Sequence, residues 1–186
     1  MGQALTVGGV WLVFGMTVFA WSVPVSAWSQ TESFENGFGG WVPDADVPAG
    51  VGWHILRSNV RAFDGQWSLE YYLDGRHDDG TIWVERTVAA TGPTVNVHID
   101  FYMWSDRKGG IGGWPVVAFA GANNPERETD FHIIGYVNYD VGWLIYTYDT
   151  TVQIGTTSMF WVAFGYSVTF ETVRTDYFDY VTITVT

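Results

Sequence analysis

The pattern of apolar and polar positions changes sharply along this chain of 186 residues. Residues 4–27 are mostly apolar and none is charged, and the first charged residue of the whole chain is Glu32. The run ends in Pro24-Val25-Ser26-Ala27, with small residues at the two positions that a signal peptidase reads. We therefore predict a secretory signal peptide over residues 1–27. The alternative is a retained apolar segment, because the run is almost long enough to span a bilayer.

After Glu32 the pattern becomes one of short strands in which apolar and polar residues alternate with period two. The clearest case is the segment 95–104. Its odd positions are all apolar, namely Val95, Val97, Ile99, Phe101 and Met103. Its even positions are Asn96, His98, Asp100, Tyr102 and Trp104. The alternation predicts a strand with one face in the core and a polar, aromatic face toward solvent or a ligand.

Further alternating or apolar segments are separated by turns rich in Gly, Asp, Asn and Pro. They lie at 67–73, 81–88, 116–120, 131–139, 142–148, 160–170 and 174–185. About eight to ten such segments and no helical periodicity predict an all-β fold, a two-sheet antiparallel β-sandwich of the jelly-roll type. We assign residues 28–186 to one such domain, preceded by the apolar signal segment.

Composition narrows the classes of partner. The formal net charge is −12, with 8 basic residues against 20 acidic ones, which argues against nucleic acid or an anionic membrane as a partner once the signal is removed. The same balance is compatible with bound cations and neutral polymers. No cysteine is present, so the sequence offers no disulfide, thiolate ligand or cysteine nucleophile.

Three short segments resemble those of β-sandwich carbohydrate-binding modules. They are Phe34-Glu35 followed by Gly37 and Gly40-Trp41, the stretch from Ala62 to Leu69, and the closing stretch from Tyr177 to Ile183. The resemblance covers nearly the whole of residues 28–186 and implies a secreted, extracellular, non-catalytic jelly-roll domain whose partner is a polysaccharide or glycan.

The resemblance also implies a structural calcium ion, because such modules commonly hold one where the first and last strands meet. Carried over by position, the ligands are Glu35, Asp64 and Asp179, completed by backbone carbonyls. Calcium prefers six to eight oxygen ligands of these kinds. Asp176 is an alternative to Asp179. The alternative for the site as a whole is that Glu35 and Asp64 are turn residues and Asp179 is a solvated strand residue.

A sugar ring stacks its apolar face on an exposed aromatic ring, while neighbouring polar side chains bind its hydroxyls. The polar face of the 95–104 segment offers both kinds of side chain. We predict a glycan site there, formed by His98, Asp100, Tyr102 and Trp104 and extended by Trp161 from a neighbouring strand. The alternatives are a platform of loop tryptophans at one end of the sandwich (Trp41, Trp53, Trp114 and Trp143), or rings that serve only in packing.

Catalytic signatures are weak. The strand carboxylates Glu70, Glu85, Asp100 and Glu171 form no close sequence cluster of the kind that sandwich glycosidases use. The histidines have no metal-binding spacing, and no nucleophile elbow occurs. We therefore favour a binding module over a glycoside hydrolase or lyase.

The competing function is a self-assembling cell-surface protein, such as a sheath or filament subunit. The chain is rich in aromatic residues and nearly free of lysine, which suits such a homo-oligomer. One assembly mechanism is donation of the segment 28–31 as a strand to a neighbouring copy.

Overall fold

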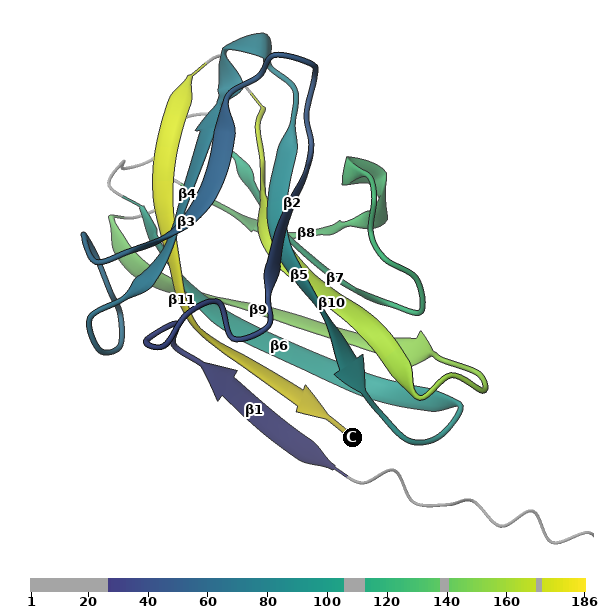
Figure 1. Cartoon of the computed structure of the whole chain (residues 1–186). Coiled ribbons are helices and arrows are strands. Elements are labelled where there is room, and N and C mark those ends of the chain that lie inside the picture. Colours follow the sequence, from purple (N-terminus) through teal and green to yellow (C-terminus); the bar gives the residue numbers. More distant parts are fainter. Residues whose placement is uncertain (1–26, 106–112, 138–140, 170–171) are drawn as a thin grey trace, which may run out of the picture.

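The computed structural model describes residues 27–105, 113–137, 141–169 and 172–186 (Figure 1). The predicted signal segment therefore lies, apart from Ala27, outside the described residues. Within them, regular structure consists of strands and two single-turn 3₁₀ helices, Gly75–His77 and Glu128–Asp130. No helix in these ranges is long and apolar enough to cross a membrane.

The strands form two antiparallel sheets, which confirms the predicted all-β sandwich. The six-stranded sheet has the order β3-β4-β11-β6-β9, with β1 also paired to β11. Its strands are β1 Trp28–Glu32, β3 Trp53–Ser58, β4 Ser68–Asp74, β6 Thr94–Ser105, β9 Gly142–Gln153 and β11 Val173–Val185. The five-stranded sheet has the order β2-β5-β10-β7-β8. Its strands are β2 Val42–Asp46, β5 Thr81–Ala89, β7 Pro115–Gly121, β8 His132–Tyr136 and β10 Met159–Ser167.

The core lies between the inward faces of the two sheets. All five odd positions of β6 from Val95 to Met103 are at most 2% exposed, as their alternation predicts. An aromatic group at the centre joins the sheets, with Phe101 of β6 stacked on Phe164 of β10 at a centroid distance of 4.7 Å and Tyr71 of β4 against Tyr166 of β10 at 6.0 Å. Each fully buried side chain of this size contributes about 1.5–3 kcal/mol through the hydrophobic effect.

Strand β11 has two halves that pair with different neighbours (Figure 1). Its first half, from Val173 to Phe178, pairs with β4, and its second half, from Val181 to Val185, pairs with β1. Between the halves a β-bulge interrupts its register with β6, and Tyr180 there has a left-handed φ of 50°. The bulge allows β11 to change direction, so that one strand pairs with β4 in its first half and with β1 in its second.

Because β1 pairs with β11 along its whole length, from Trp28 opposite Val185 to Glu32 opposite Val181, the segment predicted as a donor strand is already used within its own chain.

Candidate functional site

The even positions of β6 lie on the outward face of the six-stranded sheet. His98, Asp100, Tyr102 and Trp104 are all half-buried there, so the structure brings these four predicted residues onto one face. Their neighbours on β9 and β11 are their cross-strand partners: Thr147 and Thr182 flank Asp100, while Asp149 and Thr184 flank His98.

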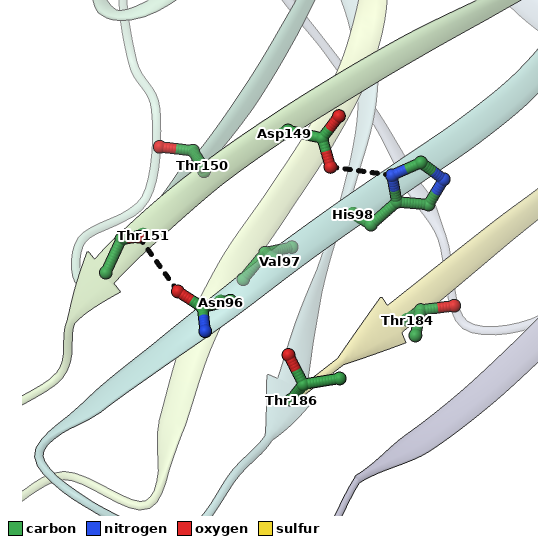
Figure 2. Close-up of a pocket in the computed structure, with 8 residues that line it drawn as sticks. All are labelled: Asn96, Val97, His98, Asp149, Thr150, Thr151, Thr184 and Thr186. Carbon is green, nitrogen blue, oxygen red and sulfur yellow. Dashed lines mark hydrogen bonds and ion pairs between the residues drawn. The ribbon is translucent and has the colours of Figure 1, made fainter.

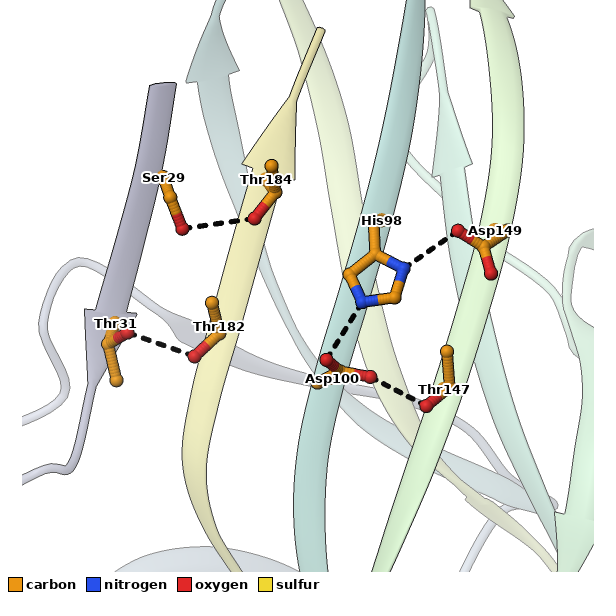
Figure 3. Close-up of polar contacts among 8 residues, drawn as sticks. All are labelled: Ser29, Thr31, His98, Asp100, Thr147, Asp149, Thr182 and Thr184. Carbon is orange, nitrogen blue, oxygen red and sulfur yellow. Dashed lines mark hydrogen bonds and ion pairs between the residues drawn. The ribbon is translucent and has the colours of Figure 1, made fainter. Parts of the chain in front are cut away.

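The part of this face around residues 96–100 of β6 is a polar region that contains no Lys or Arg. We define it by Ser29 and Thr31 on β1, Asn96, His98 and Asp100 on β6, Thr147, Asp149 and Thr151 on β9, and Thr182 and Thr184 on β11. Its hydroxyls are ordered in pairs, with Ser29 against Thr184 at 3.0 Å and Thr31 against Thr182 at 2.9 Å (Figure 3).

His98 is held between two carboxylates within this region (Figure 3). Its Nδ1 lies 2.7 Å from Asp149 Oδ1 and its Nε2 lies 2.8 Å from Asp100 Oδ2. Thr147 donates to the other oxygen of Asp100 at 2.6 Å. Only the imidazolium form can donate from both ring nitrogens. The hydrogen bonds to Asp149 and Asp100 accordingly raise the pKa of His98 above its ordinary value.

An open cavity of about 360 Å³ lies over one end of this region (Figure 2). It is lined by Asn96, Val97, His98, Asp149, Thr150, Thr151, Thr184 and Thr186. Thr151 donates to Asn96 Oδ1 at 3.0 Å, which orients the amide at its edge. The lining offers both donors and acceptors for a hydroxylated ligand.

The part of the face around Tyr102 of β6 is an aromatic cluster, formed by Phe63, Tyr102, Trp143 and Tyr180. Phe63 comes from the β3–β4 loop (residues 59–67) and stacks on Tyr102, with ring centroids 3.6 Å apart and planes at 13°. It also contacts the rings of Trp143 and Tyr180, at 5.8 and 5.9 Å. Phe63 and Tyr180, at 42% and 37%, are the most exposed members of this cluster, whereas Tyr102 and Trp143 are half-buried.

The same loop covers Tyr102 and Trp104, the two aromatic residues of β6 that the sequence predicted as glycan contacts. Phe63 lies on Tyr102, and the guanidinium of Arg61 lies over Trp104, 4.4 Å from the ring centroid. The alternation in β6 therefore predicted which of its side chains point outward, but not the loop residues that cover Tyr102 and Trp104. Phe63 lies in a turn sequence, and no local signal indicates which strand such a turn will cover.

Trp161 does not join this face. It lies on β10 of the five-stranded sheet, opposite Thr87 and Gly121. Two of the loop tryptophans, Trp41 and Trp114, are buried in the core, at 3% and 0% exposed. Trp53 is half-buried against the core at the start of β3, and Trp143 belongs to the aromatic cluster. A platform of loop tryptophans at the sandwich end is therefore not formed.

Two of the predicted calcium ligands, Glu35 and Asp179, accept hydrogen bonds from backbone amides of the β3–β4 loop, which carries the third, Asp64. Glu35 Oε1 accepts from the amides of Gln66 and Trp67, at 2.9 and 2.8 Å. Asp179 Oδ2 accepts from the amides of Phe63 and Asp64, at 2.7 and 3.0 Å. Asp179 is fully buried, which contradicts the alternative of a solvated strand residue.

Arg57 already binds two carbonyls near Glu35: it donates to the carbonyl oxygens of Phe34, at 2.5 Å, and of Glu35. No three His, Asp or Glu side chains in the described ranges form a cluster that could hold a metal ion. Asp176, the alternative ligand, forms a buried ion pair with Arg174, with N and O 2.7 Å apart. As the side chains lie, the carboxylates serve as acceptors for the loop, and the calcium site stays a prediction.

The three described carboxylates among those considered for catalysis lie apart in the fold. Asp100 lies on β6 and Glu70 on β4, with β11 between these strands, and Glu70 accepts from Ser58 at 3.1 Å. Glu85 is buried on β5 of the other sheet, where Trp83 donates to it at 2.7 Å. Glu171 lies outside the described residues.

Comparisons with known proteins bear on the fold. No family model matches the sequence, and no curated protein matches it. A solved structure described as one of the carbohydrate-binding modules of the β-sandwich superfamily matches with a TM-score of 0.54 and 15% identity. The match covers 80% of this chain and 59% of that one.

Two adhesin domains also match. They are the K1 and K3 cleaved adhesin domains of Lys-gingipain from Porphyromonas gingivalis W83, with TM-scores of 0.53 and 0.52 and identities of 15% and 14%. These matches cover 83% and 86% of this chain and 96% and 99% of the domains. The predicted resemblance to β-sandwich carbohydrate-binding modules is thus confirmed at the level of the fold.

Proposed function

We propose that this chain is an extracellular, non-catalytic module that binds a polysaccharide on the outward face of its six-stranded sheet. One observation carries the proposal: two partly exposed rings, Phe63 and Tyr180, adjoin a region of ordered hydroxyl, carboxylate and imidazole groups on the same face. Saccharide binding needs this pairing of an apolar ring with convergent polar groups.

The dimensions of the face suit a chain better than a single sugar ring. Side chains on one face of a strand recur about every 7 Å, so the row from Tyr102 through His98 to Asn96 spans about 20 Å. A saccharide stacked on Phe63 at one end would therefore have polar partners along β6 as far as the cavity beside Asn96.

Electrostatics favour a neutral glycan over an acidic one. The chain carries a formal net charge of −12, and the charged groups of the polar region are His98 and the carboxylates of Asp100 and Asp149. A uronic acid or sulfated polymer would meet the like charges of Asp100 and Asp149 in the polar region. The similarity of the fold to carbohydrate-binding modules and adhesin domains supports both the ligand class and an extracellular location.

Affinity electrophoresis tests the proposal. The chain beginning at Trp28 is run through gels containing xylan, mixed-linkage β-glucan, galactomannan or galactan, with polygalacturonan as the acidic comparison. We expect at least one neutral polymer to retard the protein and polygalacturonan to leave it unretarded. Phe63→Ala should weaken the binding by about tenfold or more, because burial of an exposed phenylalanine side chain against a ligand contributes up to about 1.5–3 kcal/mol.

Ile133→Ala is a matched control. Ile133 is 57% exposed on β8 of the five-stranded sheet, so its loss changes an exposed apolar side chain without touching the proposed face. Migration of the wild-type protein unchanged by all four neutral polymers would contradict the proposed function.

A further inference from the structure

Asp179 has a carboxylate on the outward face of the sheet that is nevertheless fully buried. It is the cross-strand partner of Tyr102, so the two side chains share the face that carries the aromatic cluster. Its exposure is 0% because the β3–β4 loop folds over it. A charged group in such a place must be compensated by strong hydrogen bonds.

Backbone amides supply this compensation. Oδ2 accepts from Phe63 and Asp64, at 2.7 and 3.0 Å, and Oδ1 accepts from Tyr180 at 2.7 Å. Among the described residues, no Lys, Arg or His forms an ion pair with Asp179. The two residues that carry the exposed rings, Phe63 and Tyr180, therefore both have their amides bound to one carboxylate.

We propose that Asp179 is a positioning residue for the glycan face, holding Phe63 and Tyr180 in place as a preformed pair of rings. The use of that pair for glycan binding rests on the proposed function, whereas the positioning itself does not. Tyr180 has a φ of 50°, a conformation that is uncommon for a residue with a large side chain and that the bulge and its amide hydrogen bond maintain. A preformed pair avoids the loss of entropy that ordering two rings on binding would require.

The arrangement requires a carboxylate. An asparagine has one acceptor oxygen and one amide group, so one side of the side chain would place N–H groups against backbone N–H groups. In Asp179→Asn, either the amides of Phe63 and Asp64 or the amide of Tyr180 would lose their acceptor. The substitution keeps the size of the side chain, so it tests the hydrogen bonds rather than the packing.

The first measurement is residue-resolved amide exchange and ring-proton chemical shifts by NMR for the wild type and Asp179→Asn. We expect exchange at Phe63 and Asp64 or at Tyr180 to accelerate about tenfold or more, while the buried amides of β6 stay protected. The ring protons of Tyr102, shifted in the wild type by Phe63 stacked at 3.6 Å, should move toward their values in unstructured peptides. Exposure of the rings without loss of the core is a signature that general destabilisation does not produce.

Asp64→Asn is the matched comparison, because it makes the same chemical change in the same loop. The side chain of Asp64 is exposed, and the loop contact to Asp179 uses its backbone amide, which the substitution keeps. We expect Asp64→Asn to leave the exchange rates at Phe63 and Tyr180 and the shifts of Tyr102 unchanged. If Asp179 acted instead as a calcium ligand beside Asp64, the two variants would behave alike, and this outcome would overturn the proposal.

The binding measurement uses the neutral polymer that most retards the wild type in affinity electrophoresis. We expect Asp179→Asn to weaken retardation about tenfold, as Phe63→Ala does, and Asp64→Asn to leave it unchanged. Wild-type retardation by a polymer together with undiminished retardation of Asp179→Asn would overturn the positioning role. If no polymer retards the wild type, the proposed function fails, and the exchange and ring-shift measurements still decide whether Asp179 positions the rings.

Discussion

His98 shows how single residues set the chemistry of the proposed face. Its two ring nitrogens contact Asp149 and Asp100 at 2.7 and 2.8 Å, an arrangement that uses both protons of the charged ring. The hydrogen bonds to these carboxylates raise its pKa above the ordinary value. The charge of the polar region therefore depends on pH through the protonation of this imidazole.

The sign of this dependence can be tested. Because the folded pKa of His98 lies above the unfolded value of about 6.5, its contribution to stability is complete below pH ~6.5 and disappears as pH rises through the folded pKa. We expect the difference in unfolding free energy between the wild type and His98→Asn to fall from pH 5 to pH 9 in urea titrations. His54, whose Nε2 lies 3.5 Å from Glu70 on the same sheet, provides a second variant, His54→Asn, for comparison. A difference for His98 that is constant over this pH range would contradict the assignment.

At the scale of elements, β11 pairs with three other strands of the six-stranded sheet, and β1 covers one edge of β11. The second half of β11 lies between β6 and β1, so β1 covers this edge of β11 and is the outer strand here among the described strands. An unpaired strand edge is a template for association with another chain.

Removal of β1 should therefore leave the second half of β11 as the edge of the sheet in place of the short strand β1. We expect a chain beginning at Phe34 to be less stable toward urea than a chain beginning at Trp28 and to form dimers or larger species in light scattering. The longer chain, which keeps the pairing from Trp28 to Glu32, is the control. A shortened chain that stays monomeric and equally stable would show that the pairing of β1 is not needed to cover the edge of β11.

At the scale of the whole molecule, the β3–β4 loop connects the start of the sandwich to its last strand. Glu35 binds the amides of Gln66 and Trp67, and Asp179 binds those of Phe63 and Asp64. The predicted calcium ion would lie here. To bind it, the carboxylates would have to exchange amide contacts for the metal, since calcium needs six to eight oxygen ligands.

Calcium removal tests this prediction. If Glu35, Asp64 and Asp179 hold the ion, excess EDTA lowers the melting temperature and added CaCl₂ restores it, because a ligand that binds only the folded state stabilises it. Glu35→Gln should abolish the response to calcium. A melting temperature that neither EDTA nor CaCl₂ changes would leave the amide hydrogen bonds as the role of these carboxylates.

The sequence by itself determined the fold class and the two faces of the strands. Alternation with period two is a local property, so the buried odd positions of β6 and the outward His98, Asp100, Tyr102 and Trp104 could be predicted from it. Tertiary structure alone decided which side chains meet. Trp161 alternates in the same way as Tyr102 but lies on the other sheet, because sheet membership depends on strand pairing across the whole chain. Phe63 became the exposed ring, and Asp179 became buried, because the β3–β4 loop folds across β6 and β11, and no short stretch of sequence encodes that contact.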